Sequence, residues 1–237
     1  MDTQLSKLYL SQSALNTFNA CPVGFKRKYL EGISWNLSSS INSKEDESRE
    51  LGRLFHVIAE RYFNGIPTGI EEGVGDMYHW FEALKRFIPR ENGLEYYPEY
   101  ELRLNRGNVK LQAKYDLILR ENDKQYTIFD WKTEAKPLSA NKAAISLQTV
   151  LYRYLLVEAG SRVFQEQILP QNVKMIYWQP TRQSTPVVLP YSEDQFIQDG
   201  WLLTNLVNKV LSYDFEKAKE IESDQCGRCQ FRILCIQ

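Results

Sequence analysis

The stretch between residues 97 and 132 constrains the fold more than any other part of the chain. Three segments, 97–104, 109–119 and 125–132, are rich in β-branched and aromatic residues and are separated by short polar turns that contain Gly or Asn. Connections of this length join only antiparallel neighbours, because a parallel crossover needs a dozen or more residues. The sequence therefore predicts a three-stranded antiparallel meander.

Segments of helical periodicity surround this meander, and two shorter strand-like segments follow it. The expected helices cover residues 11–29, interrupted at Pro22, then 49–63, 74–87, 141–158 and 192–211, and the expected later strands cover 173–178 and 187–189. Helices before the meander, and helix and strand after it, predict an α/β fold. We expect a central mixed β-sheet with helices on both faces.

Length and composition favour one domain over residues 1–237. The chain is 43% hydrophobic and 13% aromatic, which is enough to bury a sizeable core. Residues 37–48 differ from the rest, because three consecutive serines and a charged run leave almost nothing to bury. We expect a mobile loop there.

Charge and hydropathy exclude several classes of protein. The formal net charge is −1, so the chain as a whole is not drawn to nucleic acid, and a coating or packaging protein is disfavoured. Any nucleic-acid binding must come from a local channel. The first residues lack a basic start followed by an apolar run, and no apolar stretch approaches the ~20 residues of a membrane span. These features predict a cytoplasmic location and no membrane partner.

Two aspartates in the meander are candidates for a metal site. Asp116 lies in the second predicted strand, and Asp130 and Lys132 share one face near the end of the third, because side chains alternate along a strand. A solvent-facing strand edge would also explain this pattern. Aspartate is disfavoured in strands, however, and its carboxylate oxygens suit Mg or Mn. Phosphodiester hydrolysis needs such an ion to neutralise the phosphate and activate water, and Lys132 can orient that water.

Further candidates lie on the helices beside the meander. His56 falls away from the apolar stripe of its predicted helix, on a side shared with small residues, which makes it a candidate ligand, whereas His79 is interpreted as structural. Gln148 and Tyr152 are spaced i, i+4 and share a face. They either join a helix to the sheet or support Lys132 or a DNA phosphate.

The first predicted strand offers a further acidic contributor to the same site. It carries both Glu99 and Glu101. Glu101 is preferred over Glu99, but only weakly, because the pattern does not define the register of this strand.

The order of these residues resembles the RecB-type PD-(D/E)XK nucleases over nearly the whole chain. The matching positions are His56, Asp116, Asp130-Trp131-Lys132 and Gln148 with Tyr152. The resemblance implies a restriction-endonuclease-like core in which Asp116 and Asp130 bind the metal and His56 completes the site. It also implies that Lys132 is catalytic and that the helix of Gln148 and Tyr152 borders the substrate path. One departure is Ala113, where the family often has glycine.

The four cysteines suggest a second cofactor. Cys226, Cys229 and Cys235 form a C-x2-C-x5-C pattern near the end of the chain, and Cys21 lies near its beginning. The absence of an export signal argues against disulfide bonds between these cysteines. Zinc ribbons usually supply two short cysteine pairs, whereas iron-sulfur clusters accept more scattered ligands. The arrangement resembles iron-sulfur members of the RecB-like nucleases, including AddB-type subunits and CRISPR-associated exonucleases. It implies a [4Fe-4S] cluster that joins regions 1–30 and 212–237; structural free cysteines are the alternative.

Together these features lead us to expect a Mg- or Mn-dependent DNA exonuclease that acts on single-stranded ends. The resemblance implies a role in DNA repair, recombination or CRISPR adaptation, with nuclease, helicase or CRISPR adaptation proteins as partners. Two other classes stay open: a DNA-binding adaptor subunit with a nuclease-like core and little activity, and a zinc-stapled structural protein. The presence of both aspartates together with Lys132 favours the enzyme.

Overall fold

The computed structural model describes residues 4–33, 43–73, 75–121, 124–134, 136–180, 185–218, 226 and 229–235. The chain forms two compact units. The terminal unit comprises Met1–Ile41, Arg103–Gln112 and Gly200–Gln237, and the sheet unit comprises Asn42–Leu102 and Ala113–Asp199. Both predicted cysteine regions, 1–30 and 212–237, fall within the terminal unit.

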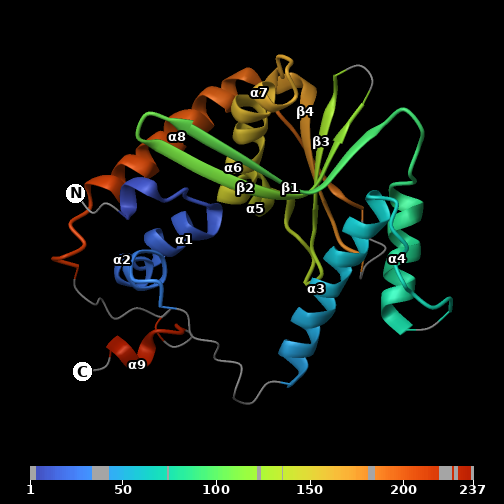
Figure 1. The fold of residues 1–237 in the computed structure, drawn as a ribbon, viewed down its shortest axis with the longest axis horizontal. Coiled ribbons are helices and arrows are strands. Elements are labelled where there is room, and N and C mark those ends of the chain that lie inside the picture. The colour runs from blue at the N-terminus through green and yellow to red at the C-terminus, as the bar shows by residue number, and fades with distance from the viewer. Residues whose placement is uncertain are drawn as a thin grey trace. The chain divides into compact units, whose positions relative to one another are not determined.

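A five-stranded mixed sheet runs through the fold, as Figure 1 shows. Its spatial order follows the chain: β1 (Glu95–Arg106), β2 (Val109–Arg120), β3 (Tyr126–Trp131), β4 (Val173–Trp178) and β5 (Val187–Pro190). β2 and β3 are antiparallel, β3 and β4 are parallel, and β4 and β5 are antiparallel. The predicted mixed sheet is confirmed. Its first three strands form the predicted meander.

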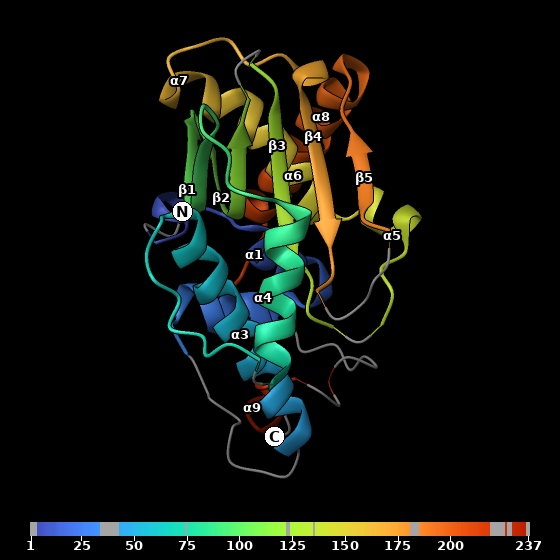
Figure 2. The same ribbon diagram turned by 90° about the vertical axis from the view of Figure 1, so that its right-hand side faces the viewer.

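One face of the sheet packs against α3 (Ser43–Phe63) and α4 (Gly75–Phe87), which cross in front of it in Figure 2. Aromatic side chains from alternate strand positions fill this layer. Trp131 stacks on Phe63 of α3, with ring centroids 6.3 Å apart and planes 9° from parallel, and Trp178 stacks on Phe87 of α4 at 4.9 Å. Phe55 and Leu84 are fully buried in the same cluster. These contacts fix α3 against the sheet.

Figure 2 places α6 (Leu147–Leu155) on the opposite face of the sheet, behind β3 and β4. The Tyr115 hydroxyl of β2 donates to the backbone carbonyl of Tyr152 at 2.8 Å, and the hydroxyls of Thr149 and Tyr177 lie 2.8 Å apart. A buried ion pair joins α6 to α8 (Glu193–Ser212), with Arg153 Nε 2.8 Å from Asp199 Oδ2. Helices therefore cover both faces of the sheet, as expected.

The single helix predicted over residues 141–158 is wrong, because the chain breaks at Ile145. α5 (Ala140–Ala144) ends there, and Ser146 caps a new helix by accepting a hydrogen bond from the amide of Thr149 at 3.2 Å. Serine side chains compete with helical backbone bonds in this way, which makes them better caps than interior residues. α6 then continues into a π-helical turn (Leu156–Gly160) and α7 (Ser161–Val163).

α3 begins at Ser43, six residues before the predicted start. The predicted mobile loop, 37–48, therefore overlaps its first residues, while 37–42 lie outside the described part of the chain.

The terminal unit contains the N-terminal helices. Ser11 caps α1 (Gln12–Ala20), as predicted, by accepting from the Ala14 amide at 3.2 Å, and Pro22 opens the next turn, α2 (Pro22–Phe25). Phe18 packs edge-to-face on Tyr213 at 5.4 Å, so the two ends of the chain share one aromatic cluster.

The remaining short elements are two 3₁₀ turns (Leu5–Lys7 and Pro170–Asn172), a π-helical turn (Lys26–Leu30) and α9 (Arg232–Cys235). Within the described residues, no helix is long and apolar enough to cross a membrane.

Candidate metal centre

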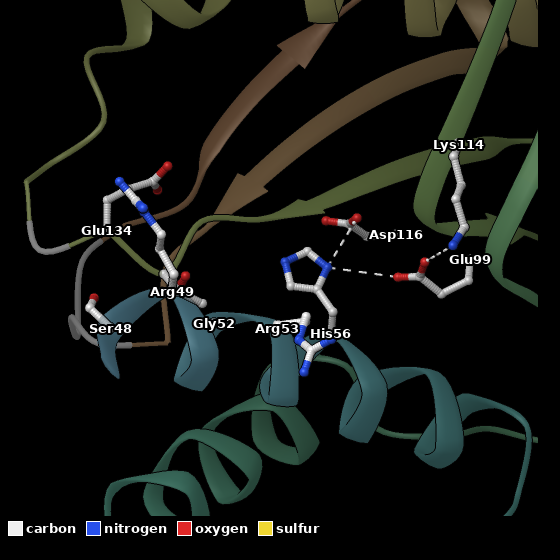
Figure 3. Close-up of a pocket in the computed structure, with 10 residues that line it drawn as sticks. Ser48, Arg49, Gly52, Arg53, His56, Glu99, Lys114, Asp116 and Glu134 are labelled. Carbon is white, nitrogen blue, oxygen red and sulfur yellow. Dashed lines mark ion pairs between the residues drawn. The ribbon is translucent and has the colours of Figure 1, made fainter. Parts of the chain in front are cut away.

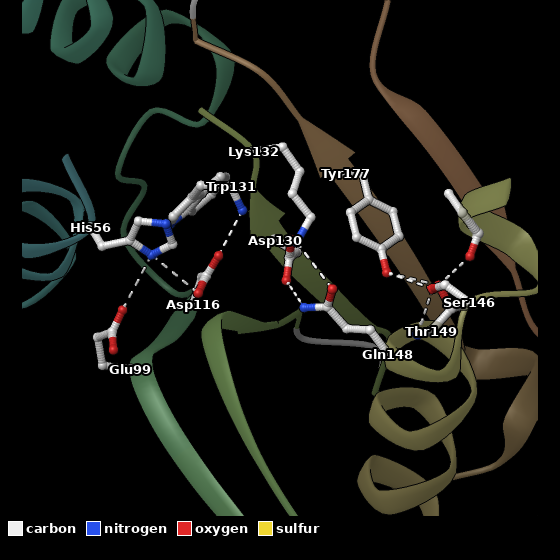
Figure 4. Close-up of polar contacts among 11 residues, drawn as sticks. His56, Glu99, Asp116, Asp130, Trp131, Lys132, Ser146, Gln148, Thr149 and Tyr177 are labelled. Atoms are coloured by element: carbon white, nitrogen blue, oxygen red, sulfur yellow. Dashed lines mark hydrogen bonds and ion pairs between the residues drawn. The ribbon is translucent and has the colours of Figure 1, made fainter. Parts of the chain in front are cut away.

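Three side chains from three elements of the sheet unit form a group that can hold a metal ion. His56 of α3 places Nδ1 3.3 Å from Asp116 Oδ1 of β2 and 3.7 Å from Glu99 Oε1 of β1. One donor atom from each lies within 4.8 Å of the others. Figure 4 shows the imidazole turned toward both carboxylates. One nitrogen and two carboxylate oxygens are a suitable donor set for a divalent ion such as Mn²⁺.

Glu99 reaches this group through an unusual backbone conformation. Its φ is +49°, in the left-handed region that residues other than glycine seldom adopt, and it interrupts the alternation of β1. Glu101, which the sequence weakly favoured, is exposed two residues further on. The structure brings Glu99 to His56 in its place. Such backbone outliers often occur at functional sites.

The charges in this group are balanced by cations of the chain. Burial disfavours the charged imidazole, but the hydrogen bonds that His56 donates to Asp116 and Glu99, together with their negative charges, outweigh it and raise the pKa of His56 to about 10. Lys114 Nζ lies 2.6 Å from Glu99 Oε2. Burial would raise the pKa of Glu99, but His56 and Lys114 hold it below its usual value. A divalent ion would compete with these cations for the same oxygens.

Asp130 lies next to this group and belongs to a second polar network. The β2–β3 register pairs Leu117 with Phe129, and one further step places Asp116 opposite Asp130, on the same face. The Asp116 carboxylate accepts a hydrogen bond from the Trp131 amide at 2.7 Å. Asp130 is 2% exposed, and its carboxylate lies outside the three-residue group. Burial and, next, the negative charge of Asp116 raise the pKa of Asp130 to about 7.

Lys132 and Gln148 hold the Asp130 carboxylate. Lys132 Nζ lies 2.5 Å from Asp130 Oδ1 and donates to Gln148 Oε1 at 3.0 Å, while the Gln148 amide donates to Asp130 Oδ2. Figure 4 shows these three side chains as a closed set beside Tyr177. Gln148 therefore contacts Lys132 directly. Tyr152, one turn later on α6, is partly buried, and burial together with the charges of Asp130 and Asp116 raises its pKa well above the usual value.

A pocket of about 480 Å³ opens over the His56 group, as Figure 3 shows. Besides the three candidate ligands, it is lined by Ser48, Arg49, Gly52, Arg53, Lys114, Thr133 and Glu134. Lys132, Gln148 and Tyr152 are not in its lining. His79, which the sequence led us to interpret as structural, is exposed on α4. No sequence pattern pointed to the basic residues of the pocket, because charged side chains near the start of a helix are usually solvated.

Gly52 allows α3 to approach the residue that follows Lys132. A Cβ atom at position 52 would lie 2.5 Å from Thr133 Oγ1, a separation that side chains essentially never adopt. The next nearest atom of Thr133 would be 3.5 Å away, an ordinary contact. The absence of a side chain at Gly52 therefore sets how closely His56, one turn further along α3, lies to β2 and β3.

Gln179 fixes the loop that forms the other wall of the pocket. Its buried side-chain amide accepts from the Leu138 amide at 3.1 Å and donates to the carbonyls of Glu134 and Lys136, both at 2.9 Å. One side chain thus satisfies three backbone groups of the loop after β3. This arrangement holds Glu134 at the pocket edge.

The four cysteines lie in the terminal unit, where Arg27 joins the N-terminal and C-terminal segments. Its guanidinium donates to Cys235 Sγ at 2.9 Å and to the carbonyls of Phe231 and Leu234 at 3.2 and 2.8 Å. The thiol of Cys21 accepts from the Gly24 amide at 3.3 Å. Over the described residues, the His56 group is the one set of three or more potential ligands whose donor atoms lie within 4.8 Å of one another.

Comparisons with known proteins show what this chain is similar to. A sequence model described as the PD-(D/E)XK nuclease superfamily matches residues 9–96 and 77–236. A protein from Eubacterium rectale, provisionally named an exonuclease, has a similar crystal structure with a TM-score of 0.50 and 13% identity, covering 94% of this chain and 87% of that one. The crystal structure of SSO0001 matches with a TM-score of 0.44 and 17% identity, covering 97% and 86% of the two chains. No curated protein matches the chain.

We expect His56→Ala to weaken Mn²⁺ binding at least tenfold, because the variant removes the only nitrogen donor of the three-residue group. Isothermal titration of the full chain with MnCl₂ measures the change. His79→Ala, at an exposed position on α4, is the matched control and should bind like the wild type. Equal affinity in the two variants would remove His56 from the site.

Gly52→Ala should also weaken Mn²⁺ binding, although alanine at a helix interior usually stabilises by about 1 kcal/mol. The new methyl group would meet Thr133 Oγ1 and displace His56 from its partners. Thr133→Ala deletes that oxygen, so the double variant Gly52→Ala/Thr133→Ala should recover most of the affinity. Failure of the double variant to recover would show that Gly52 acts through something other than this contact.

Proposed function

Because this chain belongs to the PD-(D/E)XK nuclease superfamily, we propose that it is a divalent-metal-dependent nuclease that hydrolyses phosphodiester bonds of DNA. One observation carries the proposal: His56, Glu99 and Asp116 converge beside the buried Asp130–Lys132 pair. A group of metal ligands beside a lysine suits phosphodiester hydrolysis, because the ion and the ammonium group can both stabilise negative charge on the phosphate. The sequence model gives the family, and the arrangement of the side chains supports the activity.

The ion would be Mg²⁺ or Mn²⁺, held by His56, Asp116 and Glu99, with Asp130 as a further ligand. Carboxylate oxygens favour these hard ions, and one imidazole nitrogen is compatible with Mn²⁺ in particular. A bound ion supplies positive charge for the phosphate oxygens and lowers the pKa of a water molecule. The ion would add a partner to Asp130, whose buried carboxylate is held by Lys132 and Gln148 in the described part of the chain.

Lys132 would supply a second positive charge to the reacting phosphate, in addition to that of the metal ion. Its ammonium group is oriented by Asp130 and by the Gln148 carbonyl oxygen, so it is held in one place before substrate arrives. Burial disfavours the charged amine, but Asp130 outweighs this effect and raises the pKa of Lys132. A lysine that stays protonated can orient the attacking water and stabilise developing negative charge. Gln148 positions Lys132, and Tyr152 borders the same network.

We further propose that the substrate is a single-stranded DNA end and that cleavage is exonucleolytic. The order of motifs along the chain supports this reading, and the exonuclease name of the Eubacterium rectale protein is compatible with it. A setting in DNA repair, recombination or CRISPR adaptation, with nuclease, helicase or adaptation partners, follows from the same motif order. The alternative is an adaptor subunit that binds DNA and turns over little.

We expect Asp130→Ala and Lys132→Ala each to reduce cleavage at least 100-fold, because one removes a carboxylate and the other a cation from the reacting centre. The assay measures Mn²⁺- and Mg²⁺-dependent degradation of end-labelled single-stranded DNA. Lys136→Ala, at an exposed position in the next loop, should retain wild-type rates. Thermal melting of each variant shows whether the fold survives.

Wild-type rates in either variant would contradict the assigned roles. A wild-type chain that binds DNA but cleaves none, with either metal, would favour the adaptor subunit instead.

We also propose that Cys21, Cys226, Cys229 and Cys235 bind one [4Fe-4S] cluster of structural function. Their spacing supports this, and so does Arg27, which joins the segment after Cys21 to the residues around Cys235. Three of the thiols accept N–H groups, from Gly24, Arg27 and Phe231. Sulfur that accepts such bonds is suited to the thiolate state that cluster ligation requires.

Cys229→Ala should lower the yield of soluble protein and abolish the visible absorption of an anaerobically purified sample, because cluster binding contributes directly to folding free energy. DNA cleavage should fall in step with the folded fraction, since the catalytic candidates lie in the other unit. Iron and sulfide determination quantifies the cluster. A stable, fully loaded variant, or stoichiometric zinc in the wild type, would rule the cluster out.

A further inference from the structure

We propose that Arg49 and Arg53 form a second binding site for the substrate, which holds the phosphate group next to the one that is cleaved. Both side chains line the pocket that contains His56, Glu99 and Asp116, and both come from the first turns of the described part of α3. The ligand class is a phosphodiester within a nucleic-acid strand. This inference rests on the nuclease function proposed above.

The spacing along α3 places the two arginines in line with the metal group. Positions 49, 53 and 56 follow one another at intervals of four and three residues, so they share one face of the helix. At 1.5 Å per residue, Arg53 lies about 4.5 Å and Arg49 about 10 Å from His56 along the axis. Figure 3 shows the three residues following one another along that helix. A strand whose cleaved phosphate lies at His56 can continue past both guanidinium groups.

Gly52 holds this part of the helix against the pocket. Its close contact with Thr133 lies between Arg49 and Arg53 in the sequence, on the same side of α3. The two arginines therefore extend from a segment that is anchored to the residue after β3. Their side chains are long, but the backbone that carries them is fixed at the pocket wall.

The present partner of Arg53 is one that a phosphate can replace. Arg53 makes a bidentate ion pair with Glu50, at 3.2 and 2.8 Å, but the two side chains are 76% and 66% exposed. Exposed pairs of this kind contribute little to stability, because both groups are well hydrated when apart. Guanidinium groups bind phosphate oxygens in the same bidentate geometry, with a stronger charge-assisted bond.

Local cations are needed because the chain as a whole does not attract DNA. The formal net charge is −1, and the pocket itself contains the carboxylates of Glu99, Asp116 and Glu134, which repel a phosphate chain. Lys114 is held by Glu99 within the ligand group. Arg49 and Arg53 are the two arginines among the residues that line the pocket, and they add positive charge along α3. Their role would be to bind the strand rather than to carry out chemistry.

The test compares two substrates that differ in whether they have a neighbouring phosphate. Bis(4-nitrophenyl) phosphate has a single phosphodiester, whereas a single-stranded 12-nucleotide DNA has phosphates on both sides of the cleaved bond. Arg49→Ala/Arg53→Ala should lower kcat/KM for the DNA at least tenfold more than kcat/KM for the small diester. The slope of log binding constant against log salt for the DNA should also decrease by about one.

The double variant Arg86→Ala/Arg162→Ala is the matched control. It removes two exposed arginines from α4 and α7 that do not line the pocket, with the same change in net charge. It should leave the ratio of the two kcat/KM values near that of the wild type. Equal ratios in the two double variants, or equal losses on both substrates in Arg49→Ala/Arg53→Ala, would overturn the proposal.

Binding without catalysis separates this inference from the proposed activity. Fluorescence anisotropy of the labelled 12-nucleotide DNA in EDTA needs no turnover. If the wild type cleaved neither substrate, the nuclease proposal would fail, yet weaker DNA binding by Arg49→Ala/Arg53→Ala than by the control pair would still support the phosphate site. Equal binding by the two double variants would overturn the site whatever the activity.

Discussion

The arrangement of the site depends on the buried ion pair between Asp130 and Lys132. An aspartate that is 2% exposed would be costly without partners, since burial raises its pKa to about 7 even beside a lysine. Lys132 and Gln148 therefore have to contact it, and Gln148 brings α6 onto the end of β3. The same ion pair that offsets the cost of burying this carboxylate also orients Lys132. The stability of the site and the catalytic role proposed for Lys132 therefore require the same geometry.

A second constraint acts from the other face of the sheet. α3 carries His56, and its position is set by stacked aromatic rings at its C-terminal end and by the contact of Gly52 with Thr133. The candidate ligands thus come from one helix and two strands, each fixed by its own packing. His56 Nδ1 lies 3.3 Å from Asp116 Oδ1, so a displacement of α3 away from the sheet would lengthen this contact.

Different parts of the site have different electrostatic character. The carboxylates of Glu99 and Asp116 are balanced by His56 and Lys114, while Asp130 is balanced by Lys132. Arg49 and Arg53 add positive charge on one wall of the pocket. A metal ion and a phosphate chain carry opposite charges and need opposite surroundings, and α3 carries both the candidate ligand His56 and the two arginines.

Local sequence patterns predicted the meander, the later strands, the shared face of Asp130 and Lys132, and the cap at Ser11, because strand alternation and capping depend on residues close together in the chain. The place of His56 on its helix, away from the apolar stripe, marked it as a candidate ligand. The break at Ile145 is local, but helical periodicity does not reveal it, because the Ser146 side chain competes with a continuous helix. The approach of Glu99 to His56 and the grouping of Arg49 and Arg53 with the candidate ligands depend instead on contacts between distant segments, of α3 with β1 and with the residue after β3, which no local pattern contains.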